Sequence, residues 1–260
     1  MRITLFSSNQ SRHLHLARQL SKVADEVFFV SEVNTLFPGQ VNDFFKSSPV
    51  MKKYFSNVTS AEKKIFGDIN FVPNNVRILP VKSGDLNLLS REQLYGALNS
   101  TVYIVFGSSY IKGWLVDFLL QHQAINIHMG LSPYYRGSSC NFWALYDYKP
   151  SYVGATIHML SKGLDSGDML FHCLPKIIEG DTSFDFTMRS VLVAQQSLVE
   201  TIRSETIFSF EHVKQDRKKE IRYSRNIEFN DVVAEDFLNR KLKLDDRDFI
   251  YPDLLNPSFR

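Results

Sequence analysis

The chain has 260 residues, enough for one large domain or one domain with a small appendage, and 44% of them are hydrophobic. Its 30 basic and 28 acidic side chains give a formal charge of +2, whereas nucleic-acid binders usually carry a strong basic excess, so a polynucleotide partner is disfavoured. The two cysteines, Cys140 and Cys173, lack metal-type spacing, and no apolar run has membrane-spanning length. We therefore expect a cytoplasmic protein with no metal and no membrane partner.

The first half of the chain alternates short apolar runs with amphipathic stretches, which is the sequence pattern of right-handed βαβ units. We expect strands at 2–7, 26–31, 76–81, 101–106 and 124–128, with helices at 11–22, near 88–98 and at 112–121. The predicted fold class is α/β, with a Rossmann-like, mostly parallel sheet and helices on both faces.

The long connection 34–74 contains Thr59 and Glu62 in the spacing of a capping box, before the segment AEKKIFG. This pattern predicts one or two short helices. A connection of this length usually either carries its own structure or has a function. Both a packed decoration on the sheet edge and a flap facing a substrate fit the sequence.

The last third of the chain begins with an amphipathic helix over 183–206, preceded by a capping-box pattern from Thr182 to Asp185. The charge-rich run 214–225 predicts a solvated hairpin.

A second helix is predicted over 227–240, starting at Asn230 or Asp231. The composition changes at about residue 207, so we predict a catalytic domain over 1–206 and a short C-terminal dimerisation or lid element over 207–260.

Three polar residues between 124 and 170 could carry out acyl transfer to an amine. Asn126 and His128 are two apart at the end of a predicted strand, so both side chains point to one face, at the carboxyl edge where open α/β sheets bind ligands. Asp165 lies in a glycine-flanked loop. An amide N–H of Asn126 and a protonated His128 would stabilise an oxyanion, and a carboxylate would raise the pKa of His128. By itself the Asn-x-His pair is equally compatible with structural residues, and His158 is expected in the core.

Four segments of this region resemble the signature of the N10-formyltetrahydrofolate-dependent formyltransferases. They are N-I-H at 126–128, L-S-P-Y-Y-R-G at 131–137, G-A-T-I-H at 154–158 and G-L-D-S-G-D at 163–168. The resemblance implies that Asn126, His128 and Asp165 are the catalytic residues. It also implies that N10-formyltetrahydrofolate is the formyl donor and that no metal is needed. One departure is Gly130, where many members have serine, and another is Ser132, where leucine is usual.

The resemblance also implies a folate cleft lined largely by backbone on two segments. The residues that match these segments are Phe106, Gly107, Ser108, Tyr110, Ile111, Lys162, Gly163 and Leu164.

The resemblance leaves the acceptor open. The layout is most similar to the nucleotide-sugar N-formyltransferases, which implies a nucleotide-linked amino sugar, a role in surface polysaccharide (lipopolysaccharide) biosynthesis and a homodimer. In that reading Tyr134, Tyr135 and Arg136 would bind the acceptor. The alternatives are a methionyl-tRNA formyltransferase-like enzyme, and a formyl-folate hydrolase or folate-binding module. Glycinamide ribonucleotide formyltransferases fit less well, because residues 7–13 contain no glycine.

Overall fold

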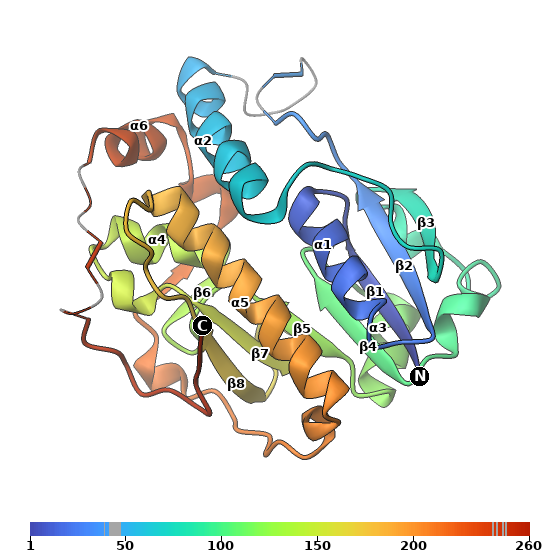
Figure 1. The fold of residues 1–260 in the computed structure, drawn as a ribbon. Helices are drawn as coiled ribbons and strands as arrows, with labels where there is room; N and C mark the ends of the chain where they lie inside the picture. Colours follow the sequence, from blue (N-terminus) through green and yellow to red (C-terminus); the bar gives the residue numbers. More distant parts are fainter. Residues whose placement is uncertain (39, 42–47, 241, 243, 246, 248) are drawn as a thin grey trace.

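The computed structural model describes residues 1–38, 40–41, 48–240, 242, 244–245, 247 and 249–260. These residues form an eight-stranded sheet in the order β10-β8-β7-β5-β4-β1-β2-β3, with α1 and α5 on one face and α3 on the other (Figure 1). The bounds of its strands are β1 Arg2–Ser8, β2 Glu26–Val33, β3 Val76–Lys82, β4 Val102–Phe106, β5 Ile125–His128, β7 Ala155–Met159, β8 Met169–Leu174 and β10 Ser258–Phe259.

The sheet is mostly parallel, as predicted. Only β7 runs against its neighbours, since its pairings with β5 and β8 are antiparallel and the other strand pairs are parallel. Parallel strands covered on both faces are near-continuous apolar runs, and β4 (VYIVF) is buried at every position. The sequence therefore determined the fold class through its hydrophobic pattern.

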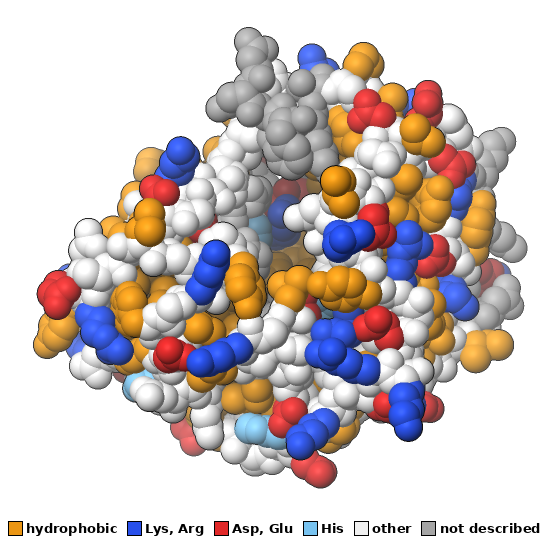
Figure 2. All heavy atoms as spheres, turned by 180° about the vertical axis from the view of Figure 1, so that it is seen from behind, with side chains coloured by type: hydrophobic (Ala, Val, Ile, Leu, Met, Phe, Trp, Pro, Cys, Tyr) orange, Lys and Arg blue, Asp and Glu red, His pale blue; other side chains and the backbone are white. Residues whose placement is uncertain are grey.

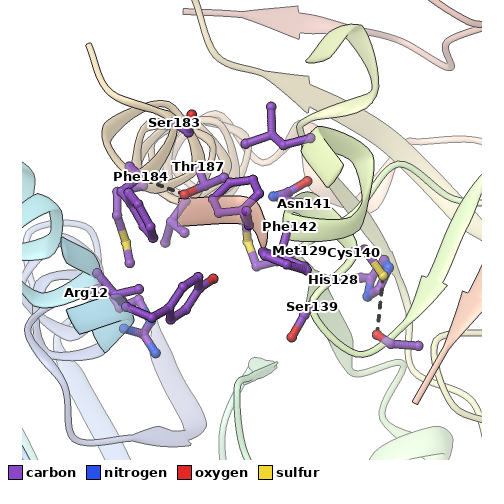
Figure 3. A pocket seen from close by; sticks show the side chains of 17 residues that line it. Arg12, His128, Met129, Ser139, Cys140, Asn141, Phe142, Ser183, Phe184 and Thr187 are labelled. Atoms are coloured by element: carbon purple, nitrogen blue, oxygen red, sulfur yellow. Dashed lines mark hydrogen bonds between the residues drawn. The ribbon is translucent and has the colours of Figure 1, made fainter. Parts of the chain in front are cut away.

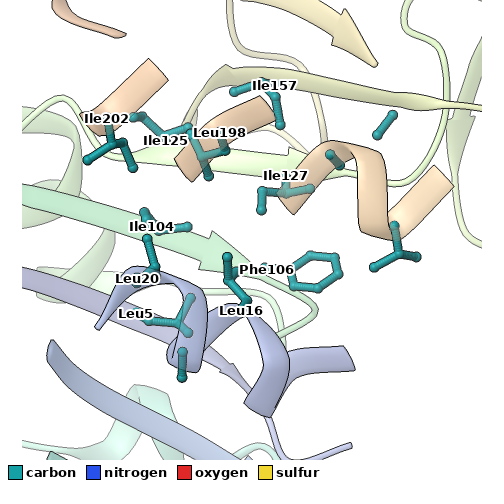
Figure 4. Close-up of a cluster of buried hydrophobic side chains, with 14 of the residues drawn as sticks. Leu5, Leu16, Leu20, Ile104, Phe106, Ile125, Ile127, Ile157, Leu198 and Ile202 are labelled. Atoms are coloured by element: carbon teal, nitrogen blue, oxygen red, sulfur yellow. The ribbon is translucent and has the colours of Figure 1, made fainter. Parts of the chain in front are cut away.

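The main core lies between the sheet and the helices α1 (Ser11–Leu20) and α5 (Ser183–Arg203), where Leu16 and Leu20 meet Leu198 and Ile202 over the central strands (Figure 4). Full burial of one such side chain contributes about 1.5–3 kcal/mol to stability. This packing fixes the position of β5 in the sheet, and with it the position of the two polar side chains near its carboxyl end. Two further helices are α3 Gly113–Gln121 and α4 Cys140–Tyr146.

The N-terminus of α5 confirms the predicted capping box. The Thr182 hydroxyl accepts from the Asp185 amide at 3.1 Å, and the Asp185 carboxylate accepts from the Thr182 amide at 2.9 Å. Two of the amide groups that a helix start leaves unpaired are satisfied in this way.

In its described part the connection 34–74 contains one long helix, α2 (Pro49–Phe66), where we predicted one or two short helices. Residues 39 and 42–47 of the connection lie outside the described part. The predicted start at Thr59 is wrong. The helix begins at Ser48, whose hydroxyl accepts from the Met51 amide at 3.1 Å, with proline at the first helical position. Thr59 lies inside the helix and its hydroxyl donates to the Phe55 carbonyl.

The helix predicted near 88–98 is also wrong. Two short 3₁₀ segments, Asp85–Leu88 and Tyr95–Leu98, stand there instead. Ser90 and Gln93 hydrogen-bond each other between the two segments, and Gly96 interrupts the second half, which weakens a continuous α-helix.

The segment after residue 206 folds back against earlier parts of the chain, where its strands β9 (Arg222–Ser224) and β10 pair with β6 (Tyr135–Gly137) and β8. The hairpin predicted for 214–225 is wrong, because β9 pairs in parallel with β6, but most of this run is exposed to solvent, as predicted. The helix α6 (Asp231–Asn239) starts as predicted, with the Asn230 side chain accepting from the Val233 amide. No helix among the described residues is long and apolar enough to cross a membrane.

Candidate active site

Two elements bring the three predicted catalytic residues together. Asn126 and His128 lie on β5, and Asp165 lies in the loop between β7 and β8. The Asp165 carboxylate accepts from Nδ1 of His128 at 3.2 Å through one oxygen and from Nδ2 of Asn126 at 3.2 Å through the other. The predicted cluster is therefore present, and its carboxylate contacts both partners.

A fourth side chain, His158 on β7, belongs to the same cluster. It faces Asn126 across the β5–β7 ladder, and its Nε2 lies 2.9 Å from Nδ2 of Asn126. Its Nδ1 lies 2.8 Å from the Met159 carbonyl, which can only accept, so Nδ1 carries the proton and Nε2 is the acceptor. Both amide hydrogens of Asn126 thus have acceptors, one on His158 and one on Asp165.

The expectation of a core role for His158 was incomplete. The side chain is buried, as predicted, but it also hydrogen-bonds the Asn126 amide. The signal that could have found it is positional, since an antiparallel strand places its residue directly opposite Asn126.

The electrostatics of the cluster favour an ion pair. Burial lowers the pKa of His128, but the Asp165 carboxylate, with a contribution from Cys140, more than offsets this and holds that pKa well above its ordinary value. Burial opposes charge on Asp165, yet His128 and His158 hold the pKa of that carboxyl well below its usual range. His128 is then a protonated imidazolium at neutral pH, with Nε2 donating to the Tyr135 carbonyl at 3.2 Å.

The loop that carries Asp165 has a strained backbone. Asp165 has φ of 46°, in the left-handed region that costs a residue with a side chain about 1–3 kcal/mol. Nearby, a Cβ at Gly167 would lie 1.7 Å from the Met159 carbonyl oxygen. The sequence G-L-D-S-G therefore holds the loop tightly against the end of β7.

One cavity, which we call the first cavity, lies on the Asn126 side of His128 and has a volume of about 280 Å³. Its walls include residues 105–111, at and after the end of β4, and residues 160, 161 and 163–165 of the loop after β7. Asn126, His128, His158 and Asp165 all line it.

A second cavity of about 320 Å³ shares His128 and Met129 with the first. It extends between β5, α4 and α5, with Phe142, Phe184 and Thr187 around it (Figure 3). His128 therefore forms a wall of both cavities.

A third cavity, the largest of those described here at about 860 Å³, shares Arg12 and Val58 with the second. Figure 3 shows Arg12 across the second cavity from His128. Arg12 is fixed by Glu62, with Nη1 2.9 Å from the carboxylate. Seen from behind, the surface has a hollow in its upper middle, with basic, acidic and histidine side chains in its floor (Figure 2).

Comparison with known proteins places this site in a family. The family model described as "Formyl transferase" matches residues 102–202, the stretch that contains all four residues of the cluster. These residues form a formyl transferase domain. The family-level resemblance seen in the sequence is thereby confirmed.

Curated relatives of this domain are named methionyl-tRNA formyltransferases. That of Anaeromyxobacter sp. strain K is 35% identical over 107 residues, which cover 41% of this chain and 34% of the relative. That of Caldicellulosiruptor saccharolyticus is 27% identical over 171 residues, covering 62% of this chain and 54% of the relative. The chain thus spans about a third to a half of the length of the curated relatives it matches.

Solved structures similar to the formyl transferase fold include a 4-N formyltransferase from Francisella tularensis, with a TM-score of 0.55, 17% identity and coverage of 87% of this chain and 76% of that one. Another is an N-formyltransferase from Helicobacter canadensis, in complex with folinic acid and dTDP-3-aminofucose. Its TM-score is 0.52 and its identity 13%, over 94% of this chain and 75% of that one. At these identities the similarity concerns the fold.

The residues expected to bind the formyl donor mostly gather in one place. Seven of the eight line the first cavity of the formyl transferase domain. The eighth, Lys162, is largely exposed and pairs with Asp117 at 2.7 Å, while its carbonyl accepts from the Tyr110 hydroxyl.

The residues expected to bind the acceptor are placed differently. Tyr134, Tyr135 and Arg136 are buried and line neither of the two cavities that meet at His128. The Tyr135 hydroxyl donates to Asp147, and Arg136 pairs with Glu220 at 2.8 Å. The turn geometry of L-S-P-Y-Y-R-G directs these side chains into the protein, so the structure does not support an acceptor contact through them.

The departure at Gly130 has a structural reason. A Cβ there would lie 2.5 Å from Cβ of Cys140 and 2.7 Å from Nε2 of His128. Cys140 and a serine at 130 compete for the same space, so the combination of glycine and cysteine keeps the wall beside His128 closely packed.

Proposed function

We propose that this protein transfers a formyl group from N10-formyltetrahydrofolate to the amino group of a nucleotide-linked deoxyaminosugar. The observation that carries the proposal is the position of His128, a protonated imidazole between two cavities and coupled to Asn126 and Asp165. A donor bound on one side and an amine on the other would meet at this side chain, which is the arrangement a group transfer needs.

The first cavity suits the formyl donor. Val105, Ile111 and Leu160 supply apolar surface, and residues 107–109, Ser161 and Gly163 carry backbone donors and acceptors in the same walls. A pterin ring, with its hydrogen-bonding groups along one edge, matches that lining. When bound, the folate would supply the formyl carbon. The proposal needs no metal.

His128 and Asn126 would stabilise the charge that develops on the formyl oxygen. The Nε2–H of His128 is held by the Tyr135 carbonyl at 3.2 Å, a long hydrogen bond that a charged oxygen would replace readily. Asn126 would release the longer of its two bonds, the 3.2 Å contact with Asp165, and keep the 2.9 Å contact with His158. Removing one such donor typically lowers the rate by about 10²–10³.

Asp165 would assist the proton transfer that the reaction requires. As the amine forms its bond to the formyl carbon it must lose a proton, and the folate nitrogen must gain one as its bond to that carbon breaks. Asp165 keeps His128 charged throughout and provides a carboxylate past which this proton can move through water.

The second and third cavities together suit an elongated acceptor. Aromatic Phe142 and Phe184 line the part next to His128, and Arg12 stands where the two cavities join. An amino sugar near His128 would place its diphosphate toward Arg12, which replaces the buried Arg136 as the proposed phosphate contact. The Helicobacter canadensis structure, with folinic acid and dTDP-3-aminofucose bound to the same fold, supports this class of acceptor.

The second candidate acceptor is methionyl-tRNA, because the curated relatives carry that name. The two are separated by incubating the protein with formyl-folate and either nucleotide-linked amino sugars or charged initiator tRNA, followed by mass spectrometry for the added formyl group. Product from the sugars supports the proposal. Product from the tRNA alone overturns the acceptor and leaves the chemistry, and release of formate without either product indicates the hydrolase. The role in surface polysaccharide synthesis depends on the first outcome.

A further inference from the structure

The segment after residue 212 lies next to the loop that carries Asp165. Val213 and Met169 exchange both backbone hydrogen bonds, Met169 donating at 2.7 Å and Val213 at 3.0 Å. This antiparallel bridge fixes residues 213–215 beside the end of the Asp165 loop, although about 45 residues separate them along the chain.

Gln215 uses this position to bind the loop backbone at two points. Its Nε2 donates to the Asp165 carbonyl at 2.9 Å and to the Gly167 carbonyl at 2.9 Å. Both partners are carbonyl oxygens, so the opposite orientation of the amide would bring three oxygens together. The amide nitrogen must therefore face the loop.

A second contact from the same segment supports the other side of the loop. Glu220 pairs with the buried Arg136, whose Nη2 lies 3.3 Å from the Leu164 carbonyl. The carbonyls at 164, 165 and 167 are thus all bound by side chains, and each of these side chains belongs to the C-terminal segment or is held by it.

The loop needs such support because its geometry is strained. A left-handed Asp165 relaxes toward ordinary backbone unless neighbouring contacts fix it. The carboxylate must also stay within about 4–6 Å of His128 to favour the charged form of the imidazole.

We propose that Gln215 is a positioning residue, which holds the backbone of Asp165 so that the carboxylate reaches His128 and Asn126. The C-terminal segment is then part of the catalytic unit. This inference rests on the proposed function for its kinetic consequence, but the position of Asp165 can be measured without turnover.

The test uses the full chain with Gln215→Met, a side chain of similar length and no charge that cannot donate. Lys214→Met introduces the same side chain at the adjacent, exposed position and serves as the control. The His128 imidazole is titrated by NMR, with its signal assigned by loss in His128→Asn. In Gln215→Met we expect the pKa of His128 to fall toward or below its ordinary value, because Asp165 moves away. The control should titrate like the wild type.

Formyl transfer gives the second readout. In Gln215→Met we expect kcat to fall at least about tenfold, with KM for the formyl donor changed less than about threefold. The reason is that a small misplacement of a catalytic group slows the chemical step. Gln215→Glu, which sets a carboxylate against two carbonyls, should be impaired at least as much.

An unchanged His128 titration in folded Gln215→Met overturns the inference. So does a kcat of Gln215→Met equal to that of the wild type, provided that the wild type transfers formyl groups. If both Gln215 variants unfold, Gln215 is a stability residue and the inference is also wrong. If the wild type transfers no formyl group while its His128 titration still responds to Gln215, the proposed function fails and the positioning role stands.

Discussion

At the scale of single residues, the site depends on hydrogen-bond partners that spacing alone does not reveal. Asn126 and His128 share a face because strand side chains alternate, and this local rule predicted both correctly. The protonation states are set by residues far along the chain. Asp165 favours the charged form of His128, and the Met159 carbonyl accepts a hydrogen bond from Nδ1 of His158, which leaves Nε2 of His158 facing Asn126.

The first prediction at this scale concerns the ion pair. His128→Asn and Asp165→Asn should each lower turnover by at least about two orders of magnitude, because each variant removes a charge that the other residue needs. Steady-state formyl transfer and circular dichroism are measured on the same samples. A folded His128→Asn protein with near-wild-type rates would remove the mechanism.

At the scale of elements, the C-terminal segment is attached to the sheet through β10 and through one buried histidine on β8. His172 accepts from the Leu255 amide at 2.9 Å through Nδ1, and its Nε2 donates to the Ser132 carbonyl at 2.8 Å. Burial lowers the pKa of His172 to about 4, only partly offset by the bond to Ser132. The neutral ring joins the tail to the segment that follows β5, the strand of Asn126 and His128.

This arrangement predicts a pH dependence of stability. The folded-state pKa of His172 lies below the unfolded value of about 6.5, so the unfolded chain binds more protons between the two values. The stabilisation is fully present above about pH 6.5 and is lost as pH falls toward 4, by about 2 kcal/mol at pH 5.

Urea unfolding at pH 7.5 and pH 5, on the wild type and on His172→Gln, checks this contribution. The glutamine variant retains a donor and an acceptor but does not titrate, so its stability should fall less between the two pH values. An equal loss in both proteins would assign the pH dependence to other groups.

At the scale of the whole molecule, the sheet, α2 and α5 together create the three connected cavities. The helix α2, which lies in the long connection, contributes Tyr54 and Val58 to the second cavity. In its described part the connection packs against α5 and also faces a cavity, so it has features of both the packed decoration and the substrate-facing flap that the sequence left open. The acceptor proposal depends on this assembly and on Arg12 at the junction of two cavities.

The prediction at this scale is that Arg12→Ala raises KM for the acceptor by at least about tenfold with little change in KM for formyl-folate, through loss of a charge-assisted phosphate contact. Arg18→Ala, on the same helix and outside the described cavities, is the control. Because Glu62 loses its guanidinium partner in Arg12→Ala and keeps only the backbone amide of residue 12, unfolding is measured alongside, and Arg12→Lys should have a smaller effect.

Salt dependence discriminates between the acceptors in the same assay. A nucleotide-linked sugar needs only a few phosphate contacts, so its KM should depend weakly on salt concentration, whereas a tRNA contact over many phosphates weakens steeply. If Arg12→Ala and Arg18→Ala have equal KM values for the acceptor, Arg12 has no role in binding its phosphates.

The sequence by itself determined what local rules can determine. Apolar runs fixed the α/β class, and Thr182 and Asp185 fixed the start of α5. The N-I-H and G-L-D-S-G segments identified Asn126, His128 and Asp165 as candidate catalytic residues through their resemblance to a family signature. Each of these depends on residues within a few positions of one another.

Only the tertiary structure decided which side chains face the cavities and which support the site. Tyr134, Tyr135 and Arg136 looked available in sequence but are buried, while Gln215 reaches the Asp165 backbone across 50 positions. Burial and long-range hydrogen bonds depend on how distant segments meet, and no local periodicity encodes that meeting.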